Sequence, residues 1–418
     1  MTAPATTVTA WSSGRFRGFW YAQTISQFGD RITEIALPLL AVTMLAATPG
    51  EVGVLTALIW LPYLFGVFVG AWVDRRSDKR RLMIVADLLR AAVLVSLPAA
   101  YLFDLVTLPQ LFAVAVLTGV GAVLFGMAYP SFFVSLVPSE AYVDANSKLS
   151  LSRAASFVAG PAVGGALVQV LTAPIALVAD ALSFVASAVL LRRIPEPAPP
   201  AEPPTATGST ARRIREGLTL LLRDRVLRAA LGCTTTVNFC TFIANTLLIL
   251  FASRELGLSA GAIGIAFGAG AFGGLAGAAL APRVTRMIGL GRTAIVGVIL
   301  FPAPLVLMAL ADGPVTAKIA LLAAAEFVSS VGVMLMDINL NALITKVTPD
   351  HARGRIAGAY STVNYGIRPL GALIGGWLGT AIGLRPTLAV AGLAGVCAAF
   401  WLLASPVRRI ASLESMGR

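Results

Sequence analysis

Apolar residues run along almost the whole chain in stretches long enough to cross a membrane. A helix rises about 1.5 Å per residue, so a hydrocarbon layer of about 30 Å takes about 20 apolar residues. Charged residues, Pro and Gly separate twelve such stretches. The expected spans lie near residues 17–46, 51–73, 82–103, 108–135, 150–170, 173–192, 226–253, 258–282, 292–310, 316–345, 356–380 and 385–405. No cleavable signal sequence precedes the first stretch, which we expect to be an uncleaved span. The pattern predicts an all-α membrane protein with twelve transmembrane helices.

Basic residues lie almost entirely in alternate loops between these stretches. One side of the membrane would carry Arg15, Arg17, Arg75 to Arg81, Arg283 to Arg292, Lys346 to Arg355, Arg408 and Arg409. The opposite loops hold only Arg254, Lys318 and Arg385. Cytoplasmic loops carry the excess of Lys and Arg in membrane proteins. Both termini are therefore expected in the cytoplasm, and the protein in the inner membrane of a bacterium.

A segment rich in proline and arginine divides the spans into two sets of six. Residues 195–215 contain Pro-Glu-Pro-Ala-Pro-Pro and end in a basic cluster, a composition typical of a linker. The expected parts are an N-terminal tail (1–15), a six-helix bundle (16–194), a cytoplasmic linker (195–222), a second six-helix bundle (223–407) and a C-terminal tail (408–418).

The two bundles share short sequence matches. Gly70 to Arg76 recurs in degraded form as Gly277 to Arg283, and Gly160-Pro161 as Arg368-Pro369, at offsets of 207 and 208 residues. Two matches at nearly one offset indicate an internal duplication and two pseudo-symmetric halves.

The composition excludes a soluble fold and several classes of function. Of 418 residues, 57% are hydrophobic and 12% charged, with a mean hydropathy of +0.84. A net charge of +12 would suggest nucleic-acid binding in a soluble protein. Here the basic residues follow the loops of one membrane face, so no nucleic-acid partner is expected.

The residues that usually carry catalysis or bind metals are scarce. Cys233, Cys240 and Cys397 lie in apolar runs, and the single histidine, His351, lies in a loop, so no metal site or catalytic dyad is expected. No phosphate-binding loop is present, and the fingerprint Gly268 to Gly273 lies inside an apolar helix without a preceding strand. We expect no cofactor and no enzyme activity.

The motif Gly-x-x-x-Gly, which lets two helix backbones approach closely, recurs every three spans. It occurs as Gly66/Gly70, Gly160/Gly164, Gly273/Gly277 and Gly371/Gly375, in spans 2, 5, 8 and 11. We expect these four helices to form the seam between the halves.

Polar side chains follow one face of several other spans. In span 1, Gln23, Gln27, Asp30 and Glu34 are spaced by four, three and four residues, which places them on one helical stripe. Spans 4, 7 and 10 have similar stripes, so spans 1, 4, 7 and 10 are expected to line a central cavity. The candidate substrate-cavity residues are Gln27, Phe125, Tyr129, Asn238, Asn245, Asn341 and Tyr365.

Acidic residues within these spans are candidates for proton coupling, because an ionisable group at bilayer depth costs at least about 2.5 kcal/mol and usually serves a pathway or has a partner. Arg31 lies beside Asp30 and Glu34 and could neutralise one of them. Glu326 has no basic residue within two turns of its own helix and is the first choice for reversible protonation. Asp337 lies nearer the cytoplasmic end, where solvation is an alternative.

Three further charged residues within spans have a structural interpretation. Arg153 and Arg368 could bind an anionic substrate group, but pairing with an acidic stripe is the favoured role. Asp180 is expected to be a structural carboxylate satisfied by nearby serines.

On these motifs the chain resembles the major facilitator superfamily, and within it the bacterial drug and siderophore exporters that include macrolide and enterobactin efflux proteins. The similar residues after span 2 are Gly70, Asp74, Arg75, Arg81, Asp87 and Arg90. Ser77 and Asp78 depart from the superfamily's usual loop motif. The resemblance implies that Asp74 meets the N-terminal end of span 11 and closes the cytoplasmic side when the cavity faces out.

Span 5 resembles the antiporter motif of drug:proton exchangers. The similar residues are Gly160, Pro161, Gly164 and Gly165. The resemblance implies a kinked helix with a smooth face on which the two halves rock.

Together these features predict the major facilitator fold and secondary active transport: proton-coupled efflux of an amphipathic drug, antibiotic or siderophore by alternating access. A solute importer or uniporter with the same fold is the alternative, and a non-transporting membrane scaffold or sensor is a third class. The expected partners are the small-molecule substrate, protons and membrane lipid, and the protein is expected to be a monomer.

Overall fold

The computed structural model describes residues 9–195, 210–349 and 352–412, and every regular element in these ranges is helical. The first half contains α1 (Gly14–Thr43), α2 (Pro49–Trp60), α3 (Gly66–Asp74), α4 (Lys79–Tyr101), α5 (Leu108–Leu136), α6 (Tyr142–Leu171) and α7 (Ala173–Arg193). The second contains α8 (Thr210–Arg223), α9 (Arg225–Arg254), α10 (Ala260–Ile288), α11 (Leu290–Leu300), α12 (Pro304–Ala309), α13 (Val315–Val347), α14 (Arg353–Ala381), α15 (Leu384–Val396) and α16 (Ala399–Leu403). Short 3-10 helices are η1 (Ala10–Ser12), η2 (Leu61–Phe65), η3 (Ser139–Ala141) and η5 (Pro406–Arg409). The tail residues 1–8 and 413–418, the linker residues 196–209 and His351 lie outside the described ranges.

Ten helical segments in the described ranges are long and apolar enough to cross a membrane. Helices α1 and α14 are 30 and 29 residues long but are not among the ten. Both carry polar and charged side chains along their length, including Asp30, Glu34 and Arg368. The same polar residues that make these two helices candidates for function lower their hydropathy.

The second, ninth and twelfth of the expected spans are interrupted, the twelfth between α15 and α16 at Cys397 and Ala398, where no proline lies. The second is α2 and α3 joined by η2, which contains Pro62, and the ninth is α11 and α12, with Pro302 and Pro304 at the break. Proline has no backbone N–H and clashes with the preceding helical turn. In the second and ninth spans the break lies where a proline interrupts the hydrogen-bond ladder.

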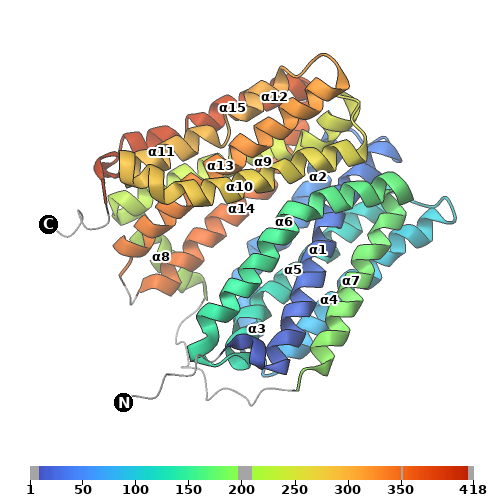
Figure 1. Cartoon of the computed structure of the whole chain (residues 1–418), viewed down its shortest axis with the longest axis horizontal. Coiled ribbons are helices and arrows are strands. Elements are labelled where there is room, and N and C mark those ends of the chain that lie inside the picture. Colours follow the sequence, from blue (N-terminus) through green and yellow to red (C-terminus); the bar gives the residue numbers. More distant parts are fainter. Residues whose placement is uncertain (1–8, 196–209, 350–351, 413–418) are drawn as a thin grey trace.

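Equivalent helices pack against each other in the two halves. Helix α1 packs on α6 and α7 as α9 packs on α14 and α15, and α4 packs on α5 and α7 as α11 packs on α13 and α15. Figure 1 shows the two sets of helices as two groups, blue to green and yellow to red. This repeated packing is what an internal duplication predicts.

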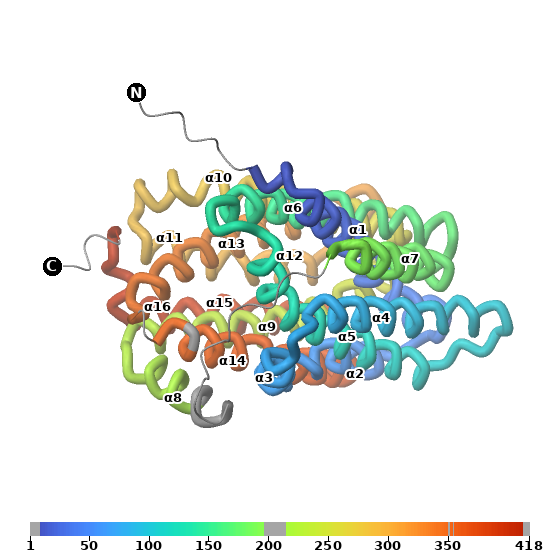
Figure 2. Tube along the Cα trace, turned by 90° about the horizontal axis from the view of Figure 1, so that it is seen from below, coloured from blue at the N-terminus to red at the C-terminus, as the bar shows by residue number. Residues whose placement is uncertain are grey.

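The two halves meet through two helix pairs, α2 with α14 and α6 with α10. Figure 2 shows α14 beside α2 and α3. We call the end where α1 begins and α7 ends the linker end, and the end where α1 and α9 finish the loop end. The start of α1 and the segment after α16 both lie at the linker end.

Buried apolar residues are distributed differently at the two ends. At the loop end one cluster joins both halves, and it includes Leu40 and Leu55 together with Leu247 and Ile263. At the linker end, the described residues form separate clusters, one built from residues 10–194 and two from residues 221–407. The halves therefore share a core at the loop end and have independent cores at the linker end.

Part of the expected linker is helical. Helix α8 lies against the start of α14, where Glu216 and Arg355 form an ion pair of 3.0 Å. Leu221 packs in one cluster with Leu227 and Ile356. The second part of the segment is thus docked on the C-terminal half.

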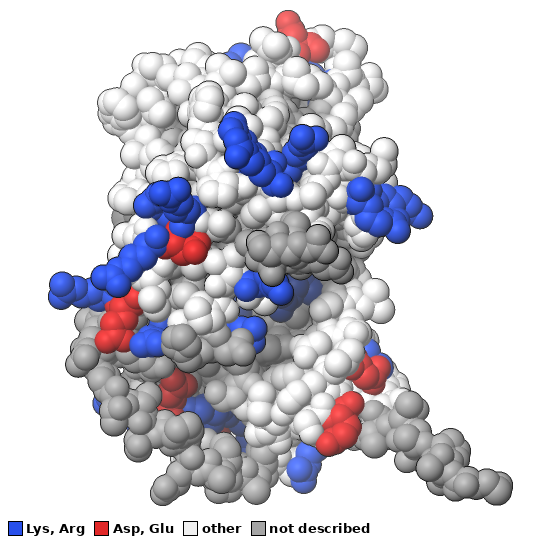
Figure 3. All heavy atoms as spheres, turned by 90° about the vertical axis from the view of Figure 1, so that its left-hand side faces the viewer, with Lys and Arg blue, Asp and Glu red and all other residues white. Residues whose placement is uncertain are grey.

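Basic side chains gather at the linker end. Figure 3 looks onto this end and shows more Lys and Arg than Asp and Glu over its surface. The loop end instead carries acidic and basic residues together, as in the ion pair of 2.9 Å between Arg385 and Glu255.

Candidate functional site

Two pairs of glycines bring the halves into contact near the loop end. A β-carbon on Gly53 of α2 would lie 2.8 Å from Cα of Gly376 in α14, and one on Gly165 of α6 would lie 2.9 Å from Cα of Gly264 in α10. Gly53 and Gly264 are 211 residues apart, and so are Gly165 and Gly376. The two contacts are therefore equivalent under the internal pseudo-symmetry.

These glycines are not those of the Gly-x-x-x-Gly motifs. The predicted seam helices do meet, but the motif glycines pack inside each half: Gly164 against Ile32 of α1, Gly277 against Val331 of α13, and Gly375 against Ile243 of α9. Gly66 and Gly70 have Met127 of α5 as their neighbour. The prediction named the seam helices and not the contact residues, because the motif shows that some helix approaches closely but not which one.

The antiporter-like residues of α6 face two different helices. Gly160 packs on the side chain of Arg31, where a β-carbon would lie 2.5 Å from Cβ of Arg31. Of the four antiporter-like residues, Gly160 and Gly164 face α1, whereas Gly165 and the carbonyl of Pro161 face α10. The motif thus serves both the packing of its own half and the contact between halves.

The acidic stripe of α1 has two different basic partners. Asp30 forms an ion pair with Arg90 of α4, and Arg31 pairs with Glu34 at 2.6 Å. Arg31 also lies over the ring of Phe157, 4.0 Å from its centroid. Sequence spacing had placed Arg31 beside both acids, and the structure assigns it to Glu34 alone.

Arg90 is the centre of a buried polar cluster in the first half. Its guanidinium lies 3.8 Å from the ring centroid of Phe184, and the charges of Asp30, Asp87 and Asp180 all act on it. Asp180 accepts hydrogen bonds from Thr33 and Ser183, which agrees with its predicted structural role.

Glycines make room for this cluster. A β-carbon on Gly121 of α5 would lie 2.5 Å from Cγ of Arg90, and one on Gly29 of α1 would lie 2.8 Å from Cβ of Ser183. Asp87 and Arg90 were predicted by resemblance as part of the motif that follows span 2, and the sequence carries no sign that Arg90 pairs with Asp30, 60 residues away.

In the second half, a polar stripe of α14 faces α9. Thr234 and Tyr360 hydroxyls are 2.8 Å apart, and Asn238 donates to Asn364 at 3.1 Å. Tyr360, Asn364 and Arg368 follow at intervals of four residues and share one helical face.

Glu326 and Asp337 lie on α13 without a hydrogen bond or ion pair to any described residue. The backbone and Cβ of Glu326 lie beside Gly270 of α10, where a β-carbon would be 3.4 Å away. Glu326 is thus a carboxyl group between two apolar helices. Asp337 acts electrostatically on Arg368 and Tyr360.

Aromatic rings from both halves surround Arg368. Its guanidinium carbon lies 4.4 Å from the ring centroids of Trp60 and Tyr365 and 4.9 Å from that of Phe242. Tyr63 stacks on Tyr365 with centroids 5.8 Å apart. The sequence analysis named Tyr365 but missed Trp60, Tyr63 and Phe242, which lie in apolar runs indistinguishable from core. We call these four rings and Arg368 the Arg368 cage.

The remaining predicted cavity residues are dispersed. Tyr129 packs on Phe19, with centroids 5.4 Å apart, inside the first half, and Phe125 belongs to the same apolar cluster. Gln27 is half-buried and Asn245 exposed. Asn341 lies near the linker end in a pocket shared with Lys346 and Arg353. The structure brings Asn238 and Tyr365 to the α9–α14 face, but not the others.

The loop-motif residues lie at the linker end. Asp74 is the last residue of α3 and is exposed, as are Arg75 and Arg81. The backbone N–H of Arg81 donates to Asp78 at 2.8 Å, which caps α4.

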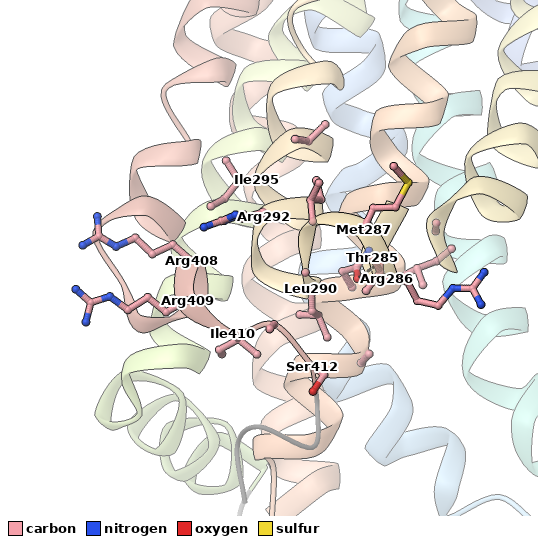
Figure 4. A pocket seen from close by; sticks show the side chains of 18 of the residues that line it. Thr285, Arg286, Met287, Leu290, Arg292, Ile295, Arg408, Arg409, Ile410 and Ser412 are labelled. Atoms are coloured by element: carbon pink, nitrogen blue, oxygen red, sulfur yellow. Dashed lines mark hydrogen bonds between the residues drawn. The ribbon is translucent and has the colours of Figure 1, made fainter. Parts of the chain in front are cut away.

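A separate pocket lies within the second half at the linker end, with a volume of about 1400 Å³. Figure 4 shows Arg286 on one side of it and Arg292, Arg408 and Arg409 on the other. Its lining comes from α10, α11, α13 and the C-terminal segment, so it does not join the contacts between the halves. Within the described residues, no group of three His, Cys, Asp or Glu side chains could hold a metal ion.

Comparison with known proteins gives one family. A profile described as Major Facilitator Superfamily matches residues 19–372. The multidrug efflux pump Tap of Mycobacterium tuberculosis (strain ATCC 25618 / H37Rv) is 28% identical over 416 residues, 93% of this chain and 93% of that protein. The MFS-type transporter YfiS of Bacillus subtilis (strain 168) is 26% identical over 381 residues, 89% and 88% of the two chains.

Solved structures share the fold at low identity. The nucleoside transporter NupG matches with a TM-score of 0.78 and 12% identity, over 94% of this chain and 99% of that one. A bacterial homologue of the iron transporter ferroportin in an inward-facing state matches with a TM-score of 0.71 and 19% identity, over 93% and 98%.

Proposed function

The chain belongs to the Major Facilitator Superfamily, and from that premise we propose that it is a secondary active transporter that exports amphipathic small molecules in exchange for protons. It is a multi-pass protein of the bacterial inner membrane and not an enzyme. The name of the mycobacterial relatives, multidrug efflux pump Tap, favours export.

We count α1 and α14 with the ten apolar segments, which gives twelve spans in two bundles, residues 16–194 and 223–407. The linker end carries the basic surface and is assigned to the cytoplasm. Both termini then lie in the cytoplasm, and α8 lies at the cytoplasmic surface.

The observation that carries alternating access is the shared core at the loop end beside independent cores at the linker end. With this orientation the halves are closed toward the outside and separable toward the cytoplasm. The two glycine contacts, Gly53 with Gly376 and Gly165 with Gly264, are the points on which the halves rock, because side-chain-free backbones can slide or separate without unlocking interdigitated groups.

Proton coupling is assigned to Glu326, with Asp30 as the second candidate. Asp30 is neutralised by Arg90. Glu326, on α13, has no ion pair among the described residues, and its Cβ lies beside Gly270 of α10. A charged carboxylate at bilayer depth is costly, so binding of a proton to Glu326 changes the free energy of packing α13 against α10. If protonation weakens substrate affinity, substrate binding must release the proton to the same extent.

The test is uptake of amphipathic fluorescent compounds, cationic and anionic, into energised inverted membrane vesicles that contain the protein. Export predicts uptake that is absent from vesicles without the protein and is abolished by nigericin, which collapses the pH gradient. Uptake that is unaffected by nigericin would contradict proton coupling and indicate a uniporter. Stable binding of a partner protein without any flux would instead favour a scaffold.

A further inference from the structure

The Arg368 cage covers the faces of a guanidinium but leaves its hydrogen-bond donors unused. Trp60 and Tyr365 rings are nearly parallel, with an interplanar angle of 10°, and Arg368 lies 4.4 Å from both centroids. Rings in these positions satisfy the faces of the cation by cation–π attraction. They offer nothing to the N–H groups, which point out from the edge of the guanidinium plane.

The N–H donors of Arg368 have no partner among the described residues. Its Nε is buried and unpaired, and no ion pair within 4.0 Å joins Arg368 to Asp337, the acidic residue that acts on it electrostatically. A buried, unpaired charged donor costs free energy. Arg90, which is buried, has a carboxylate partner in Asp30. In contrast, no carboxylate of the described residues pairs with Arg368, so its donors are open to a ligand.

The geometry points to a substrate subsite for a carboxylate attached to an aromatic ring. A carboxylate matches the edge of a guanidinium, which presents its donors as a planar fork. An aromatic group beside it would pack against the rings of Tyr63, Phe242 and Trp60. This assignment deepens the proposed transport function, on which it rests, by naming amphipathic aromatic carboxylates as the substrate class.

The subsite is built from both halves. Trp60 and Tyr63 belong to α2 and η2, and Phe242, Tyr365 and Arg368 belong to α9 and α14. Rocking that separates α2 from α14 would dismantle the cage. A ligand bound there therefore has different affinities in the two conformations, which is the requirement for a substrate that shifts the equilibrium.

The direct test is binding of two matched probes to the purified full-length chain by isothermal titration calorimetry. The probes are 2-naphthylacetate and its uncharged analogue 2-naphthylacetamide, which differ in the carboxylate. The parent protein is expected to bind the anion about tenfold more tightly or better, since the lost contact is a charge-assisted hydrogen bond. Equal affinities for the two probes, or no binding of either probe, would overturn the assignment. This result requires only the parent protein.

The variant test uses Arg368→Gln and Arg368→Lys. Arg368→Gln should weaken binding of the anion about tenfold and leave the amide unchanged, and Arg368→Lys should keep part of the preference because it retains charge without the fork. The unchanged amide affinity serves as the check that the variant is folded. An anion affinity unchanged in Arg368→Gln would overturn the assignment.

The Arg368 subsite and proton-coupled export can be contradicted separately. Proton-dependent transport of a cationic dye, with no preference for the anionic probe, would overturn the subsite and leave export standing. Carboxylate binding that depends on Arg368, with no transport of any compound, would support the subsite and contradict the exporter.

Discussion

Gly53 of α2 and Gly376 of α14 are in backbone contact: a β-carbon on Gly376 would lie 2.9 Å from Cα of Gly53. Gly165 and Gly264 make the equivalent contact in the other helix pair, because the offset of the internal repeat relates Gly53 to Gly264 and Gly165 to Gly376. Both contacts join the halves at the loop end, where the core is shared, and we propose that the halves move on these two contacts.

A large side chain at this joint should block transport. Gly264→Leu puts a side chain where a β-carbon already lies 3.0 Å from Cα of Gly165, so the halves cannot close on each other. We expect transport in vesicles to fall about tenfold or more, as overpacking of a close helix contact costs about 1–3 kcal/mol. Gly274→Leu is the matched control on the same helix, because nothing lies within 4 Å of a β-carbon there. Equal loss in both variants would point to a general helix defect.

A disulfide at the loop end should lock the protein in the conformation described here. A β-carbon on Gly50 would lie 3.5 Å from Oγ1 of Thr380, close to the spacing that a disulfide requires. In a background with the three native cysteines replaced by Ser, oxidation of Gly50→Cys/Thr380→Cys is expected to abolish transport, and dithiothreitol to restore it. The single Gly50→Cys variant is the control. Full transport by the oxidised double variant would show that the loop end does not need to open.

Removing Arg90 should be more damaging than removing its partner. Arg90→Gln leaves the half-buried Asp30 and the buried Asp87 and Asp180 without their cation, and loss of one partner of a buried pair costs about 3–5 kcal/mol. We expect a clear fall in the thermal unfolding midpoint, larger than that of Asp30→Asn. Arg153→Gln, at an exposed position, is the control and should unfold like the parent. A midpoint unchanged in Arg90→Gln would contradict the cluster.

The helices could be predicted from the sequence because hydropathy is a property of each segment alone. The helices that form the seam could also be predicted, but the residues that make the contacts between helices could not. Gly164 and Gly165 are adjacent, yet one faces α1 and the other α10, because consecutive residues point about 100° apart on a helix. Nothing in the apolar pattern shows which neighbour each face meets.

Partners across helices in the candidate site could not be predicted either. The polar stripe of α1 was visible at helical spacing, but the cation that pairs with Asp30 lies 60 residues away in α4. The Arg368 cage draws on Trp60 and Phe242, which belong to other apolar segments. Stripes within one helix are predictable from spacing, whereas partners across helices depend on the packing of the bundle.

The measurement that tests the account most directly is proton release from acidified inverted vesicles when an exported compound is added, with the parent protein, Glu326→Gln and Glu140→Gln. Glu140 is an exposed carboxylate at the linker end and serves as the control. We expect release with the parent and with Glu140→Gln and none with Glu326→Gln, because substrate binding must displace the proton that Glu326 holds. Undiminished release by Glu326→Gln would contradict its role as the coupling site, and uptake of the compound without release by the parent would contradict proton exchange itself.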